Sequence, residues 1–149
     1  MNSSIRFFSE GISFILKEKR KIREWLVLVI KEEFMLPGDI NYIFCGDDYL
    51  ADLNKTYLDH NTFTDILTFP LPDKNVKISG DIFISIDRVK ENSTSFDQPF
   101  ETELKRVMVH GVLHLLGFKD KTRVEKECMT EKENYYLRKV ACINVSRGT

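Results

Sequence analysis

The chain has 149 residues, of which 42 % are hydrophobic and 30 % are charged, a length and composition typical of one globular domain. We therefore expect a single domain over residues 1–149, with a core large enough to fold without disulfides or a structural metal ion. The 22 Lys and Arg against 23 Asp and Glu give a net charge of -1, which excludes a histone-like polycation. Any nucleic acid must then bind a local patch of the surface.

The location of the protein is indicated by its cysteines and its apolar segments. The three cysteines lie far apart and form no C-x-x-C pair, as is typical of reduced thiols in a cytoplasmic protein. The apolar N-terminal residues are interrupted by Arg6 and Glu10 and do not resemble a signal peptide. The longest apolar run, residues 25–30, is far shorter than the roughly 20 residues of a membrane span. We expect a cytoplasmic protein with no membrane partner.

Apolar residues recur in short runs typical of strands and at three- and four-residue intervals typical of helices. In chain order they predict a strand at 5–8, a helix at 19–34, a strand at 40–45, a helix at 46–57, strands at 66–69 and 82–86, and helices at 87–93, 99–117 and 122–139. Gly117 suits the end of one helix and Thr122 the cap of the next. The sum is an α+β fold, a small mixed β-sheet packed with about five helices.

His110 and His114 stand four residues apart within the helix predicted at 99–117, so both imidazoles leave the same helix face. This is the spacing by which H-E-x-x-H enzymes present two nitrogen ligands to one zinc ion. Gly117 then ends the helix, and Asp120 follows His114 by six residues, so the chain can return with an oxygen ligand. The pattern predicts a zincin-like site in which His110, His114 and Asp120 hold one Zn²⁺ per chain and leave one position open.

A simpler alternative is that both histidines are core side chains bonded to backbone. Buried imidazoles need partners for their ring nitrogens, however, and a shared metal ion supplies them. Gly111 stands where the H-E-x-x-H enzymes carry the glutamate that serves as general base, which argues against peptide hydrolysis. A metal ion that acidifies water suits phosphodiester cleavage as well.

The segment HGVLHLLGFKD at residues 110–120 resembles the H-G-x-L-H-L-x-G-Y-D-H signature of the YbeY family, single-strand-specific endoribonucleases of bacterial rRNA maturation. Two more blocks are similar to that family. L-N at 53–54 with T-D-I-L-T-F-P at 64–70 matches its L-N and T-D-V-L-S-F-P, and G-D-I at 80–82 matches its G-D-I. The three ordered blocks span most of residues 53–120.

The resemblance implies that His110 and His114 are zinc ligands. It implies zinc-dependent cleavage of single-stranded RNA in maturation of the 16S rRNA 3′ end and in ribosome quality control. The implied partners are single-stranded rRNA and components of the small ribosomal subunit, with no DNA. Two alternatives stay open at this point, a zincin-like metallopeptidase and a non-catalytic ribosome-assembly module whose metal ion is structural.

Two positions depart from the family pattern. Without a gap, the family's third histidine falls on Asp120 and its preceding aspartate on Lys119. With one inserted residue the pair would be Asp120 and Lys121, but lysine is a poor zinc ligand, so the ungapped alignment is preferred. A family arginine with an implied role at the substrate phosphate falls on Leu58, which leaves that role to His60 or to a lysine near the metal ion.

The remaining candidates concern the substrate. We take Lys119, Lys121 and Asp81 as candidate substrate-binding residues. Asp81 and Asp65 each stand at the start of a buried strand, where they either line the cleft or bond loop amides; for Asp81 both interpretations stay open, and for Asp65 we expect the loop bonds. The basic run at residues 17–23, together with the lysines and arginine near residues 119–126, is the candidate phosphate-contacting surface.

Overall fold

The four-stranded mixed sheet at the centre of the molecule has the order β1-β2-β4-β3. The computed structural model describes residues 4–58, 64–72 and 76–140. Strands β1, β2 and β4 run parallel, and β3 pairs antiparallel with β4 at one edge. The elements in chain order are β1 (Ser4–Ser9), α1 (Lys19–Glu32), β2 (Leu36–Cys45), α2 (Asp47–Leu58), β3 (Ile66–Leu71), β4 (Lys77–Ser85), α3 (Ile86–Ser95), α4 (Phe100–Leu115) and α5 (Arg123–Val140). The predicted α+β class, mixed sheet and five helices are confirmed.

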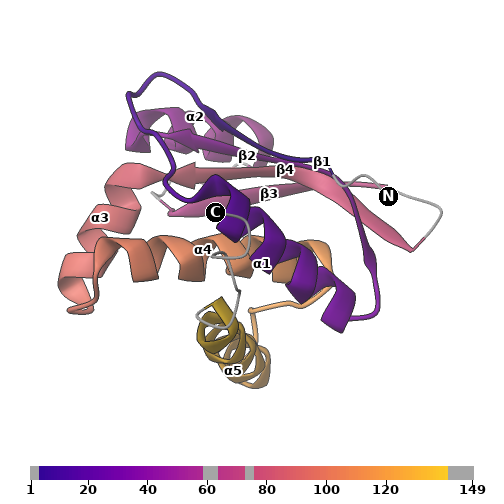
Figure 1. Cartoon of the computed structure of the whole chain (residues 1–149). Helices are drawn as coiled ribbons and strands as arrows, with labels where there is room; N and C mark the ends of the chain where they lie inside the picture. The colour runs from indigo at the N-terminus through magenta and orange to yellow at the C-terminus, as the bar shows by residue number, and fades with distance from the viewer. Residues whose placement is uncertain (1–3, 59–63, 73–75, 141–149) are drawn as a thin grey trace.

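The helices form layers on the two faces of the sheet. Figure 1 shows α2 on one face, α1 and α4 on the other, and α5 beyond α4. The indole N–H of Trp25 in α1 donates to the Tyr136 carbonyl of α5 over 2.7 Å, and the Tyr42 hydroxyl of β2 donates to the Met108 carbonyl of α4 over 2.7 Å. These buried bonds fix α4 and α5 relative to the sheet. Among the described residues, no helix combines the length and apolar character needed to cross a membrane.

Helix α4 packs closely on the strands at two glycines, Gly111 on the helix and Gly80 on β4. A Cβ atom at Gly111 would lie 2.9 Å from Cγ2 of Ile82 and 3.0 Å from Cδ1 of Ile66. A Cβ atom at Gly80 would lie 2.8 Å from the Phe69 carbonyl oxygen. Contacts this short are closer than side-chain packing tolerates. A side chain at position 111 would therefore point at the sheet.

Element boundaries differ from the sequence-based expectations at two strands. Strand β2 begins at Leu36 instead of residue 40, because a bulge between Pro37 and Ile40 lets the Pro-Gly segment continue the pairing with β4. Strand β4 begins at Lys77 instead of residue 82. It ends at Ser85, whose hydroxyl caps α3 by accepting from the Arg88 amide over 3.1 Å.

The start of α5 agrees with the cap that the sequence predicts at Thr122. Thr122 Oγ1 accepts from the Glu125 amide over 3.1 Å, and Glu125 Oε1 accepts from the Thr122 amide over 2.9 Å. This reciprocal pair is a capping box of the T-x-x-E type. The predicted cap at Thr122 is confirmed.

Candidate metal centre

Three ligand-type atoms converge between the end of α4 and the start of α5. His110 Nε2 and His114 Nε2 lie 3.0 Å apart, and Asp120 Oδ2 lies 3.2 Å from the first and 3.3 Å from the second. Zinc bonds of about 2.0–2.1 Å at tetrahedral angles place ligand atoms about 3.3 Å apart. His110, His114 and Asp120 therefore form a group that could hold a metal ion, as their spacing predicts.

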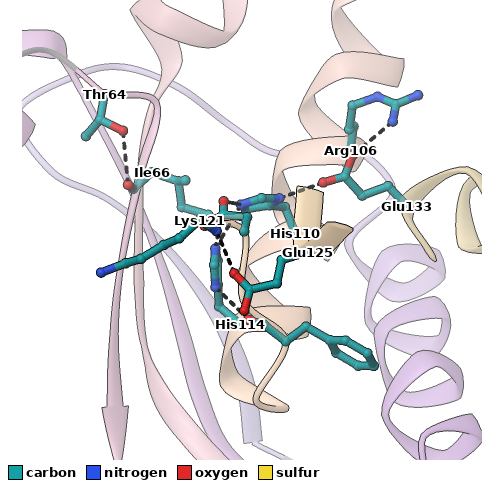
Figure 2. A network of polar contacts seen from close by, with 10 residues as sticks. Thr64, Ile66, Arg106, His110, His114, Lys121, Glu125 and Glu133 are labelled. Carbon is teal, nitrogen blue, oxygen red and sulfur yellow. Dashed lines mark hydrogen bonds and ion pairs between the residues drawn. The ribbon is translucent and has the colours of Figure 1, made fainter. Parts of the chain in front are cut away.

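The opposite nitrogen of each imidazole is held by an acceptor, which sets the direction of the ring. His110 Nδ1 lies 2.6 Å from Glu133 Oε2, and His114 Nδ1 lies 3.0 Å from the Phe118 carbonyl oxygen. Figure 2 shows Glu133 of α5 between His110 and Arg106, whose Nη1 lies 3.0 Å from Glu133 Oε1. Because carboxylate and carbonyl oxygens accept hydrogen bonds, both Nδ1 atoms are the donors. The Nε2 atom of each ring therefore lies on the side that faces Asp120. Metal-binding histidines are usually supported in this way.

Asp120 reaches the histidines because the chain turns sharply after α4. Gly117 has a φ of +105°, its amide donates to the His114 carbonyl over 2.9 Å, and the Phe118 amide donates to the Leu113 carbonyl over 3.0 Å. Glycine adopts this conformation without a steric penalty. On the far side of Asp120, the amides of Lys121 and Thr122 donate to Glu125 Oε1 over 3.0 and 2.9 Å. The chain is thus held on both sides of Asp120, by the turn at Gly117 and by the bonds to Glu125. The short segment between them places Asp120 as the third ligand-type residue.

Two cavities flank the three residues, and both are lined by Asp65, His110 and Asp120. The larger, of about 570 Å³, extends along β3 and the end of α2; its other lining residues are Asn54, Leu58, Thr64, Ile66, Leu67, Thr68, His114 and Lys121. The smaller, of about 280 Å³, extends along α4; its other lining residues are Glu103, Arg106, Val107 and Glu133. Asp65 and Asp120 are common to both cavities. The larger cavity adds only the cation of Lys121, whereas the smaller adds two further carboxyl groups, those of Glu103 and Glu133, and the cation of Arg106.

Burial and neighbouring charges shift three pKa values around the smaller cavity. Burial lowers the pKa of His110, but its hydrogen bond to Glu133 and the nearby carboxylates outweigh burial and leave the pKa raised. The pKa of Asp65 is raised by burial, against the opposing effect of His110. Burial also raises the pKa of Glu103, assisted by the negative charges of Asp65 and Glu133. Burial and nearby negative charge thus favour the protonated forms of Asp65 and Glu103.

The candidate substrate-binding residues are not brought together. Lys121 lines the larger cavity, whereas Lys119 is exposed and belongs to the lining of neither cavity. Asp81 lies on the α2 face of the sheet, since its neighbours Gly80 and Ile82 face α4, and its Oδ1 accepts from the Asn41 side chain over 3.0 Å. His60 lies outside the described residues.

The basic run before and within α1 is also remote from the centre. Arg23 Nε donates to the Ile5 carbonyl of β1 over 2.9 Å, which places the run along the β1 edge of the sheet. The two histidines instead lie beside β3, at the opposite edge. The run and the lysines near Asp120 do not form one continuous surface.

Sequence reasoning missed Glu133 and Arg106 and expected only loop bonds from Asp65, which lines both cavities. A signal for Glu133 exists, because it lies between Met129 and Tyr136 on the buried face of α5. A glutamate within an apolar helix stripe needs a partner. Asp65 carries no comparable signal, because its side chain meets His110 only after α4 has packed on the sheet.

Sequence comparisons with known proteins identify one family. The endoribonuclease YbeY family model matches residues 9–141. The endoribonuclease YbeY of Cytophaga hutchinsonii is 47 % identical over 134 residues, which cover 90 % of this chain and 94 % of that protein. That of Christiangramia forsetii is 46 % identical over 143 residues, covering 96 % of both. The solution structure of a Thermotoga maritima protein matches with a TM-score of 0.64 and 31 % identity, covering 91 % of this chain and 88 % of that one.

Replacing Glu133 by glutamine should weaken metal binding while leaving the three ligand-type residues in place. Glutamine cannot stabilise the charge that His110 acquires when it donates to a metal ion, so we expect affinity for Co²⁺ to fall about 10- to 100-fold. The measurement is a Co²⁺ titration followed by visible absorption. Glu131→Gln, an exposed position on the same helix, is the control. Equal Co²⁺ affinities in wild type and Glu133→Gln would contradict the inference that Glu133 strengthens metal binding through His110.

The raised pKa of Glu103 predicts that wild type and the Glu103→Gln variant differ in stability by an amount that depends on pH. The folded chain holds the Glu103 proton more tightly than the ordinary pKa of 4.5 allows, so its contribution to stability is complete below that pH and is lost as pH rises through the raised pKa. Glu103→Gln cannot titrate. Its free energy of unfolding relative to wild type should therefore increase from pH 4 to pH about 8 in metal-free urea titrations. Glu101→Gln, exposed on the same helix, should show no such trend.

Proposed function

Since this chain belongs to the endoribonuclease YbeY family, we propose that it is a zinc-dependent endoribonuclease that cleaves single-stranded RNA, with His110, His114 and Asp120 as the ligands of one Zn²⁺. Homologues with this name are hydrolases, and the chain is an enzyme of that class. The proposed substrate is rRNA, at the 3′ end of 16S rRNA and in ribosome quality control. The proposed partners belong to the small ribosomal subunit, and the proposed location is the cytoplasm.

The observation that supports zinc most strongly is the convergence of His110, His114 and Asp120 with both Nδ1 atoms already bonded. Two imidazole nitrogens and one carboxylate oxygen are a ligand set that zinc prefers, and three protein ligands leave a position open for substrate. When bound there, zinc would supply a Lewis acid for a phosphate oxygen and would acidify a water molecule. The side chain of Asp120 is partly exposed and lines both cavities, so a molecule that enters either cavity would reach the three residues.

The chain's own residues suit a polyanionic substrate on one side of the centre. Lys121 lines the larger cavity beside His114, on the side of His110 away from Glu133 (Figure 2). Leu58, which stands where the family carries arginine, lines the same cavity. We assign to Lys121 the contact with the RNA phosphate that this arginine would otherwise make. Lys119 and Asp81 are weaker candidates, because neither lines this cavity.

Peptide hydrolysis is not supported by the centre. A peptidase of the H-E-x-x-H type uses the residue after the first histidine as general base. Here that residue is Gly111, and a side chain built there would meet Ile82 and Ile66 of the sheet. The position therefore faces away from the cavities.

The proposed activity predicts that the purified protein carries about one zinc per chain and cleaves single-stranded RNA until a chelator is added. His114→Ala should lose the metal ion, because one of three ligands is removed, and should lose RNA cleavage with it. Elemental analysis and a gel assay with single-stranded, duplex and protein substrates provide the measurements. Circular dichroism should show the variant folded, since a core of this size does not depend on the site.

Three results would overturn the proposal. The first is zinc-loaded wild type that leaves single-stranded RNA intact. The second is casein cleavage that disappears in His114→Ala. The third is RNA cleavage that persists without metal. The first of these results would favour the structural-metal module.

Lys121→Ala should reduce RNA affinity without releasing zinc, because Lys121 lines the larger cavity but supplies no ligand atom. One lost phosphate contact lowers the slope of log affinity against log salt by about 1. Fluorescence anisotropy with a labelled RNA at several salt concentrations measures that slope. Lys119→Ala, two residues away and exposed, is the matched control. An unchanged slope in Lys121→Ala, or an equal change in both variants, would contradict the assignment.

A further inference from the structure

The smaller cavity contains a carboxyl group that the proposed reaction does not use. Glu103 lies on the same α4 face as Val107, His110 and His114, two turns before His110. Its side chain is almost fully buried, at 3 % relative exposure. The neighbouring Arg106 guanidinium bonds Glu133 and Asn134 over 3.0 and 2.9 Å. Over residues 4–58, 64–72 and 76–140, no hydrogen bond or ion pair reaches the Glu103 carboxyl.

A buried polar group without a hydrogen bond lowers the stability of the folded chain, because it gives up its bonds to water without replacing them. In a native structure such a group often marks a position where something from outside the chain binds. Glu103 lines the cavity that opens beside His110. The missing partner of Glu103 would therefore be a molecule that enters this cavity.

The cavity is placed to receive part of the same molecule that occupies the metal centre. It shares Asp65, His110 and Asp120 with the larger cavity, so one substrate can extend into both. Its volume of about 280 Å³ is just below the roughly 300–1,000 Å³ of ordinary ligand pockets, which suits a single ring system better than a length of chain. Val107 gives it an apolar wall.

Charge decides which part of an RNA enters. Four carboxyl groups line the smaller cavity, those of Asp65, Glu103, Asp120 and Glu133, against the single cation of Arg106. A phosphate would be repelled by these groups. The backbone is therefore expected in the larger cavity, and an uncharged group that donates hydrogen bonds fits the smaller one.

We propose that the smaller cavity is a nucleobase pocket in which Glu103, together with Asp65, selects a base that carries an exocyclic amino group. This inference rests on the proposed RNA cleavage at the adjacent centre. Adenine, cytosine and guanine each present an amino group that can donate to a carboxylate. Uracil has no amino group, and its one donor, the N3–H, is flanked by two carbonyl oxygens that would face the carboxyl groups. A site built to pair a buried group rejects a ligand that cannot pair it.

The experiment uses zinc-loaded, full-length protein and labelled oligouridine strands that contain one adenosine, cytidine or guanosine, with all-uridine RNA as reference. Wild type should cleave next to the amino-bearing base at least about 10-fold faster, in kcat/KM, than at a uridine. Glu103→Met, of similar length but without an oxygen acceptor, should lose most of this preference, because it cannot accept from an amino group. Glu101→Met on the same helix should keep it. Asp65→Ala provides a second variant in case Glu103→Met does not fold.

The outcomes separate the two proposals. Equal cleavage of all strands, with no change in either variant, would overturn the base pocket and leave the proposed function standing. If wild type cleaves none of the strands, the proposed function fails, and anisotropy with the same RNAs tests the pocket alone. Tighter binding of amino-bearing strands that is lost in Glu103→Met would support the pocket, and equal binding would overturn it.

Discussion

The close packing of α4 on β3 and β4 is the constraint from which the geometry of the centre follows. Gly111 on the helix packs directly on the Ile82 and Ile66 side chains, Gly80 on the strand packs against Leu115 of the helix, and the nearest atoms would be less than 3 Å from an added Cβ at either glycine. The face of α4 that carries the histidines is thereby fixed beside the edge strand, where Asp65 precedes Ile66. A larger residue at either glycine would displace the helix, and with it both imidazoles, relative to Asp65.

Negative charge accumulates around this centre to a degree that the near-neutral composition does not indicate. Asp65, Glu103, Asp120 and Glu133 line one cavity, yet the chain as a whole has a net charge of only -1. On the proposed function, a cation held by His110, His114 and Asp120 would offset part of this negative charge where the phosphate must lie. Recognition of RNA then depends on that cation and on Lys121 more than on a broad basic surface. The basic run of α1, on the far edge of the sheet, is not needed for it.

Helix and strand types could be predicted from the sequence, because each element repeats its apolar residues with its own period. The pair of histidines and Asp120 could be predicted for the same reason, since helix geometry and the Gly117 turn are local. Strand β2 extended further than expected because the bulge near Pro37 depends on pairing with β4. Glu133 beside His110 could not be predicted, and for Asp65 the cleft position is only one of two interpretations that the sequence allows, because both placements arise from packing of segments 23 and 45 residues from His110 in the chain. Such contacts have no local pattern.

The centre is assembled from residues of α4, of α5 and of the short turn between them. It therefore stays assembled only while the two helices remain packed together. Asp120 is fixed by the capping box that begins α5, and His110 is aligned by Glu133 from the third turn of that helix. Detachment of α5 from α4 would remove both in one event, while the sheet and α4 could remain intact. The lifetime of the assembled centre is therefore limited by local opening of α5, whose free energy lies at or below that of global unfolding. The buried bond from Trp25 to the Tyr136 carbonyl, far from any reacting group, thus helps to set how long the centre stays competent.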